Sequence, residues 1–148
     1  MAPFRFRLAR VLDWYEKQCA LEVSRLHVCS AAVAEVATQI VRIREALSAM
    51  ESELVQAASA SALDLVAMDF YRQSTKRQEL SLGAELKKRR HALEAQRAIL
   101  EAARRRFRLL EKLRERRLSE HTYAEDQELE ELAADAFRAA SFRHGHGA

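Results

Sequence analysis

Apolar residues recur at alternating steps of four and three from residue 8 to residue 54. A 3.5-residue apolar period keeps one narrow stripe facing a partner helix and predicts a left-handed coiled coil. Glu22 is the only charged residue on the stripe, which we call the first seam. The first seam consists of Leu8, Leu12, Tyr15, Cys19, Glu22, Leu26, Cys29, Val33, Val36, Ile40, Ile43, Leu47, Met50 and Leu54.

A weaker stripe of the same period lies in the second half of the chain. Arg89 and Gln96 interrupt it as polar layers, and Ala103 fills one layer with a small side chain. Past residue 110 the apolar positions continue with shifts in phase, which loosen a coiled coil locally. The main members of this second seam are Leu82, Leu86, Leu93, Leu100, Phe107 and Leu110.

The stretch between the two seams predicts a hairpin turn. After Val55 it contains only Gln, Ala and Ser up to residue 62, and Ser61 followed by Asp64 is typical of a helix N-cap. Helices joined by a short turn run antiparallel, so we expect Leu47 opposite residues 67–74. The predicted fold is all-α, a single domain (1–148) forming a long two-helix antiparallel coiled-coil hairpin. Its parts are a helix over about 4–57, a turn over about 58–62, a helix over about 63–140 and a frayed tail over 141–148.

Composition agrees with long helices in a thin structure. Between Pro3 and Gly145 the chain has one glycine, Gly83, and no proline, and 32% of its residues are charged. Both Gly and Pro disfavour helix interiors. The two cysteines, Cys19 and Cys29, lie on one helix roughly 15 Å apart, too far for a disulfide. We expect them to be free thiols in a reducing cytoplasm, with no secretory signal and no transmembrane helix.

Charge is segregated along the chain, although the net charge is only +3. Residues 45–71 contain no Lys or Arg, residues 87–117 are mainly basic, and residues 120–135 contain seven acidic residues and no Lys or Arg. Runs of like charge are common on solvent-exposed helix surfaces. A chain whose electrostatic potential changes sign along its length can also bind different partners at different places.

No arrangement of residues typical of an enzyme occurs. The chain has no Gly-rich phosphate loop, no HExxH and no CxxC, and a two-helix hairpin offers little concavity for a catalytic pocket. We therefore expect no enzymatic activity, no catalytic residue, no cofactor and no metal site; the His144 and His146 pair is interpreted as part of a frayed tail. Nucleic-acid binding is not expected either, because the basic residues interleave with seam residues and precede an acidic block.

Several stretches resemble the flagellar type III export stalk protein, the FliJ family. The opening Phe4-Arg5-Phe6-Arg7-Leu8-Ala9-Arg10-Val11-Leu12-Asp13 is similar to the family's basic-aromatic start, and the Ala/Ser stretch falls where the family turns. Residues 105–117 resemble its Arg-Lys-x-x-Glu-Lys-Leu-x-Glu-Lys-Arg motif. Residues 126–133 resemble its closing motif, although Glu128-Leu129-Glu130-Glu131 lacks the usual Lys.

The resemblance implies a non-enzymatic stalk and chaperone component of the flagellar export apparatus. Such a stalk inserts into the hexameric export ATPase and contacts the cytoplasmic domain of the export-gate membrane protein, with export chaperones as further partners. It would be cytoplasmic, peripheral to the inner membrane at the flagellar base, and not inserted in the membrane. Two alternatives stay open, a generic cytoplasmic coiled-coil adaptor and the equivalent stalk of a virulence-type secretion system.

Two partner surfaces follow from this interpretation. Antiparallel pairing brings the basic N-terminus near the basic stretch of the second helix, so the predicted ATPase-binding residues are Arg5, Arg7, Arg10, Arg105, Arg106 and Arg108. The start of the second helix has more apolar residues than one seam can bury. The predicted gate-binding residues there are Leu63, Leu65, Val66, Phe70 and Tyr71.

Overall fold

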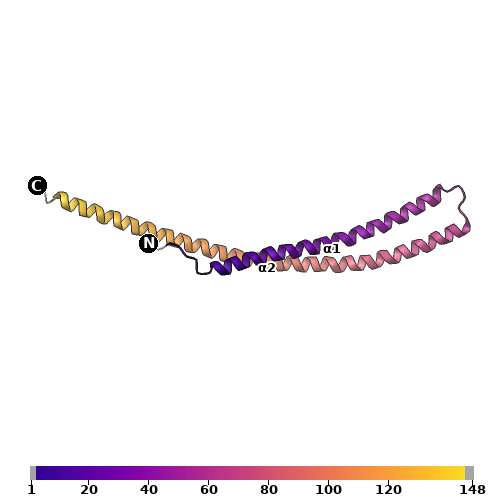
Figure 1. Ribbon diagram of the computed structural model, residues 1–148, viewed down its shortest axis with the longest axis horizontal. Coiled ribbons are helices and arrows are strands. Elements are labelled where there is room, and N and C mark those ends of the chain that lie inside the picture. The colour runs from indigo at the N-terminus through magenta and orange to yellow at the C-terminus, as the bar shows by residue number, and fades with distance from the viewer. Residues whose placement is uncertain (1–2, 146–148) are drawn as a thin grey trace. The chain divides into compact units, whose positions relative to one another are not determined.

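The computed structural model describes residues 3–145 and consists of two long α-helices. Helix α1 spans Ala9–Gln56 and helix α2 spans Ala62–Gly145, and residues 3–145 contain no strand. A short turn over residues 57–61 joins them, and beyond it the helices run antiparallel and side by side (Figure 1). The predicted all-α helical hairpin is confirmed.

Two of the predicted helix boundaries differ from those observed. Helix α1 begins at Ala9 rather than near residue 4, because residues 4–8 form a non-helical segment that lies on α2. Helix α2 continues to Gly145, so residues 141–145 of the predicted tail are helical. The stretch after Asp135 is rich in Ala and other residues that tolerate a helix well, which explains the extension. The rest of the predicted tail, residues 146–148, lies outside the described residues.

A reciprocal cap begins α2, as the sequence predicts. The backbone N–H of Asp64 donates to Ser61 Oγ at 3.2 Å, and Asp64 Oδ2 accepts from the Ser61 backbone N–H at 2.9 Å. The Asp64 carboxylate also accepts from the Ser61 hydroxyl at 2.8 Å. The bonds from the Ser61 backbone N–H and, to a lesser extent, from the Ser61 hydroxyl lower the pKa of the Asp64 carboxyl. Two N–H groups at the helix start are thereby satisfied, which fixes where α2 begins.

The chain divides into two compact units. The turn unit comprises Cys19–Ala102, and the terminal unit comprises Met1–Gln18 and Ala103–Ala148. In the turn unit the buried apolar side chains are Val36 and Ile40 of α1 and Met68 and Leu100 of α2. All four lie on the facing stripes of the two helices, so the core is one side chain wide on each helix.

Two ion pairs flank the seam of the turn unit. Arg72 Nε lies 2.6 Å from Glu51 Oε1, and Arg44 pairs with Glu79, seven residues further along each helix. The register of the seam itself is given by the buried contact between Glu22 and Gln96. Counted from that contact along the two antiparallel helices, Leu47 lies opposite residue 71, which agrees with the predicted pairing of Leu47 with residues 67–74.

A buried polar layer interrupts the apolar core of the turn unit. Glu22 is 7% exposed and Gln96 is 9% exposed, and the Gln96 side-chain amide donates to the Glu22 carboxylate. The one charged residue of the first seam thus has a partner on the facing helix. Cys19 and Cys29 are free and half-buried.

Helix α1 contains a stretch that is more apolar than expected for a chain without a transmembrane helix. By length and composition it contains an 18-residue window with a mean hydropathy of 1.3, which meets a criterion for membrane-spanning helices. Only 6% of that window is buried. Core helices of water-soluble proteins meet the same criterion, so hydropathy does not decide the environment of α1.

Candidate functional site

The first turns of α2 present an exposed apolar surface near the hairpin turn. Leu63 is 78% exposed, Phe70 is 70% exposed, and Leu65 and Val66 are also exposed. Leu63, Val66 and Phe70 are three and four residues apart, so they share one face of the helix. Helix α1 ends at Gln56 and Met68 fills the seam position, which leaves this face uncovered. Leu65 points about 160° away from Leu63, so it is exposed on another side of the same turn. We call Leu63, Leu65, Val66 and Phe70 together the tip surface.

Tyr71 does not belong to the tip surface. Its side chain is half-buried, three residues after buried Met68, so it is less accessible to a partner than the four exposed residues. Val55, near the end of α1, is 85% exposed and was not predicted as part of this surface. Its position directly after seam residue Leu54 indicates an outward direction, because adjacent helical residues point about 100° apart.

The acidic character expected around the tip surface is reduced by local contacts. Glu51 pairs with Arg72, the first basic residue after the acidic stretch. Asp64 is engaged in the cap with Ser61, and Asp69 accepts a hydrogen bond from Gln73 at 3.0 Å. The tip surface is therefore mainly apolar, and its surroundings are only moderately acidic.

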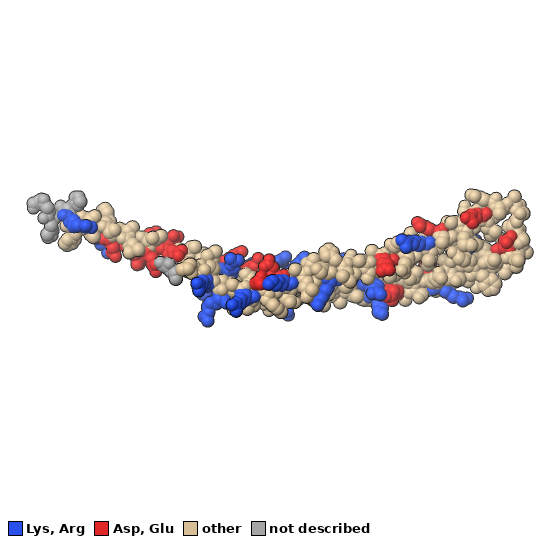
Figure 2. Space-filling model, in the orientation of Figure 1, with Lys and Arg blue, Asp and Glu red and all other residues tan. Residues whose placement is uncertain are grey.

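The terminal unit brings together the two groups of predicted basic residues. Residues 1–18 and 103–121 contain twelve Lys and Arg against five Asp and Glu, a net charge of +7. On the face drawn in Figure 2, Lys and Arg gather near the N-terminal segment, and Asp and Glu gather further along α2 toward its C-terminus. The predicted ATPase-binding residues are all exposed. We call this set the basic surface: Arg5, Arg7, Arg10, Arg105, Arg106 and Arg108.

Most arginines of the basic surface have no acidic partner within the described residues. Within residues 3–145, Arg5, Arg7, Arg10, Arg106 and Arg108 make no ion pair. Nearby cations do pair: Lys17 Nζ lies 2.9 Å from Asp13, and this hydrogen bond raises the pKa of Lys17. Guanidinium groups stay charged at any physiological pH, so the basic surface presents a permanent positive field.

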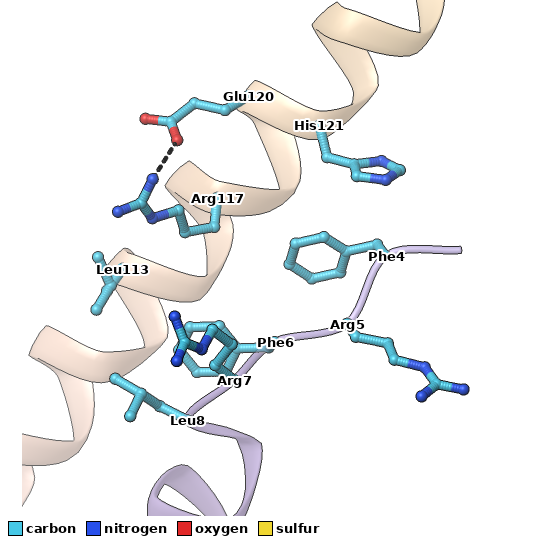
Figure 3. A pocket seen from close by; sticks show the side chains of 9 residues that line it. All are labelled: Phe4, Arg5, Phe6, Arg7, Leu8, Leu113, Arg117, Glu120 and His121. Atoms are coloured by element: carbon cyan, nitrogen blue, oxygen red, sulfur yellow. Dashed lines mark hydrogen bonds and ion pairs between the residues drawn. The ribbon is translucent and has the colours of Figure 1, made fainter. Parts of the chain in front are cut away.

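A short N-terminal strap, residues 4–8, positions part of the basic surface. Phe4 and Phe6 are half-buried against α2, whereas Arg5 and Arg7 are exposed (Figure 3). In an extended chain successive side chains point to opposite sides, so Arg5 points away from α2 between the two phenylalanines, whereas Arg7 begins the turn that leads into α1. The Phe4 ring meets the His121 imidazole edge-on with centroids 5.5 Å apart.

The strap and α2 enclose a shallow hollow of about 870 Å³, lined on the helix side by Leu113, Arg117, Glu120 and His121. Arg117 pairs with Glu120 at 3.0 Å inside it (Figure 3). The sequence interpretation placed residues 4–8 in a helix and so missed this contact. The period-two alternation from Phe4 to Arg7 was the available signal.

The side chains gathered in the tip surface and the basic surface are suited to binding other molecules. Within residues 3–145, no group of three or more His, Cys, Asp or Glu side chains is placed to hold a metal ion. His146, one half of the His pair, lies outside the described residues. An apolar tip and a cationic surface are features that bind other macromolecules.

Comparison with known proteins adds no relative. No family model, no curated protein and no solved structure matches the chain. The resemblance to the export stalk family therefore stays a hypothesis that depends on the residues quoted above.

Proposed function

We propose that this protein is a non-enzymatic stalk of the flagellar type III export apparatus. In this proposal the basic surface binds the hexameric export ATPase and the tip surface binds the cytoplasmic domain of the export gate. The protein would work in the cytoplasm at the flagellar base, without inserting in the membrane. The fold, an antiparallel helical hairpin, is compatible with that role but is shared by many coiled coils.

The basic surface is the observation on which the proposal depends most. Packing of the strap on α2 places Arg5, Arg7 and Arg10 in the same unit as Arg105–Arg108, and five of the six predicted arginines there make no ion pair within the described residues. Exposed cations clustered in this way attract an acidic partner surface and speed its association. Such an attraction weakens with salt, because exposed charges are screened over about 8–10 Å at physiological ionic strength.

Co-purification with the cognate export ATPase, followed by ATPase assays, tests this placement. Charge reversal of Arg105, Arg106 and Arg108 to Glu should abolish most of the stimulation, and raised salt should weaken it for the native chain. A matched control is reversal of Lys87, Lys88 and Arg90, which are equally exposed cations of the turn unit. Stimulation that survives reversal of the basic surface, or is lost equally in the control, would show the placement to be wrong.

The tip surface has its own test. Leu65→Ala and Phe70→Ala should impair binding to the gate domain while leaving helicity and ATPase binding unchanged, because both side chains are exposed and add little to the core. Leu80→Ala provides the control, since Leu80 is also 70% exposed on α2 but lies outside the tip. Normal gate binding by both tip variants would contradict a docking role.

Failure of the two tests together would favour a different function. A chain that binds neither the ATPase nor the gate would be better explained as a coiled-coil adaptor of an unrelated system. Binding to the ATPase of a virulence-type secretion system alone would indicate the equivalent stalk of that system.

A further inference from the structure

The last part of α2, residues 122–143, lies in the terminal unit beyond the strap. Its contacts with the N-terminal segment end near His121, and every residue from 126 to 143 is exposed. Several of these residues are nevertheless large and apolar. Leu129 is 63% exposed, Leu132 is 66% exposed and Phe137 is 75% exposed.

These side chains form a face and are not scattered around the helix. At about 100° per residue, the apolar face fits within an arc of about 140°. That width is typical of a helix that packs against another element. The apolar face consists of Leu129, Leu132, Ala133, Ala136, Phe137 and Ala140.

Acidic residues border the apolar face on both sides. Glu128 and Asp135 lie along one edge, and Asp126 and Glu130 lie along the other, by the same helical geometry. From residue 122 to residue 137 there are six Asp and Glu and no Lys or Arg. Within the described part of the chain, Asp126, Glu128 and Glu130 make no ion pair. Asp135 pairs with Arg138 at 3.1 Å. An apolar stripe with an anionic border on each side, in which three of the four named carboxylates make no ion pair within the described residues, is thus available for a partner.

Acidic residues at and next to the borders also repel one another along the helix. Asp126 and Glu130, and likewise Glu131 and Asp135, are four residues apart, where like charges destabilise a helix by about 0.2–0.5 kcal/mol per pair. Cations brought alongside by a partner would relieve this repulsion. Binding would therefore stabilise the helix as well as cover its apolar face.

The charge of the borders selects among the occupants of the face. Two copies of this segment would set acidic borders against acidic borders in either orientation, which disfavours pairing. An anionic membrane surface would be repelled for the same reason. A helix with an apolar stripe flanked by Lys or Arg is complementary in both shape and charge.

We propose that residues 122–143 bind a basic amphipathic helix of a partner protein along the apolar face. The inference does not depend on the proposed function, because it concerns a segment to which neither the ATPase nor the gate was assigned. It predicts an interaction that needs both the leucines of the face and the acidic side chains at its borders.

Fluorescence anisotropy with a synthetic helical peptide tests the proposal on the full chain. The probe is a three-heptad peptide with Leu at positions a and d and Lys at e and g, compared with the same peptide carrying Glu at e and g and with a scrambled Lys peptide. The Lys peptide should bind best. Leu129→Ser with Leu132→Ser should lower its affinity by about tenfold or more, since each leucine loses its buried contact.

Two further variants separate the face from general stickiness and from misfolding. Phe142→Ser is the matched control, because Phe142 is 75% exposed but points about 140° away from Leu129. Glu128→Lys with Glu130→Lys should keep helicity, measured by circular dichroism, and shift preference from the Lys peptide to the Glu peptide.

The outcomes divide cleanly. Preference for the Lys peptide that depends on both leucines and reverses with the lysine variant supports the proposal. Equal binding of the scrambled peptide, an equal loss in the Phe142 variant, or unchanged preference in the lysine variant overturns it. A dimer in sedimentation analysis that the leucine variant abolishes also overturns it, since the face would then belong to a second copy.

Discussion

Replacement of Gln96 by Leu tests the buried polar layer of the turn unit. The Gln96 side-chain amide donates to the Glu22 carboxylate and, at 3.3 Å, to the Glu22 backbone carbonyl oxygen. The other carboxylate oxygen of Glu22 accepts from Arg25 Nη1 at 2.7 Å. With Leu at position 96, one oxygen of a buried carboxylate loses its donor on the facing helix.

The size of the effect follows from the two lost hydrogen bonds. A hydrogen bond to a charged group contributes about 1.5–3 kcal/mol, and one to a neutral carbonyl about 0.5–1.5 kcal/mol. The leucine offsets part of this loss through its own burial, worth up to about 1.5–3 kcal/mol relative to exposure. We therefore expect Gln96→Leu to lower the free energy of unfolding by about 1–3 kcal/mol.

The double variant is predicted to behave differently. Changing both Glu22 and Gln96 to Leu removes the buried charge together with its partner, and such replacements are often neutral or stabilising by about 1–4 kcal/mol. The double variant should thus be at least as stable as the native chain, although each single variant is less stable. Non-additivity of this kind is what a double-mutant cycle measures.

Urea denaturation followed by circular dichroism provides the free energies for the four proteins. Gln78→Leu is the control, since Gln78 is an exposed glutamine on the same helix, and a change within about 0.5 kcal/mol is expected. If Gln96→Leu is as stable as the double variant, the Glu22 carboxylate does not need its partner and the reasoning about the layer is refuted.

Three further predictions concern the turn unit. Cysteines placed at Leu47 and Tyr71, in a background without the native cysteines, should crosslink within one chain; exclusively intermolecular crosslinks would contradict the hairpin register. The hydrogen bond from Ser61 lowers the pKa of the Asp64 carboxyl. The cap should therefore stabilise the first turn of α2 fully at pH values above the ordinary carboxyl pKa, and this stabilisation should be lost as the pH falls through the lowered pKa of Asp64. Hydrogen exchange should show this loss in the native chain and not in Asp64→Asn. Gly83→Ala should raise the free energy of unfolding by about 0.5–1 kcal/mol in urea titrations, because an added Cβ meets nothing within 4 Å and Ala favours the helix; a lower stability would reveal a hidden role for the glycine.

The first seam was predictable because all of its layers but that of Glu22 contain an uncharged residue typical of a seam at regular spacing. Val36 and Ile40 fall on it and are buried, and even Glu22 is buried where the period places it. The hydrophobic pattern failed in the early part of α2, where the seam contains Thr75, only 4% exposed. Extending the alternation of four- and three-residue steps backward from Leu82 would have reached Thr75 and Met68. The spacing of buried positions continues through this part of α2, although some of the residues at those positions are polar.

The candidate surfaces were only partly predictable. Exposure of Leu63 and Phe70 followed from the excess of apolar residues near the turn, whereas the half-buried position of Tyr71 depends on register, which sequence alone did not fix. The strap was missed because Phe4 and Phe6 were interpreted as the start of a helix. Their contact with α2 joins residues far apart in sequence, and no local propensity reports such a contact.

The position of the turn has a consequence for the order in which the chain folds. Contacting residues are 21 positions apart at Glu51 and Arg72, 35 apart at Arg44 and Glu79, and 74 apart at Glu22 and Gln96. Each contact shortens the loop that the next must close, so folding can begin at the turn and proceed stepwise toward the chain ends. The strap, whose Phe4 meets a residue more than a hundred positions away, closes the largest loop and should form last. Local opening should consequently be most frequent where the basic surface lies, which makes that surface the most adaptable to the shape of a partner.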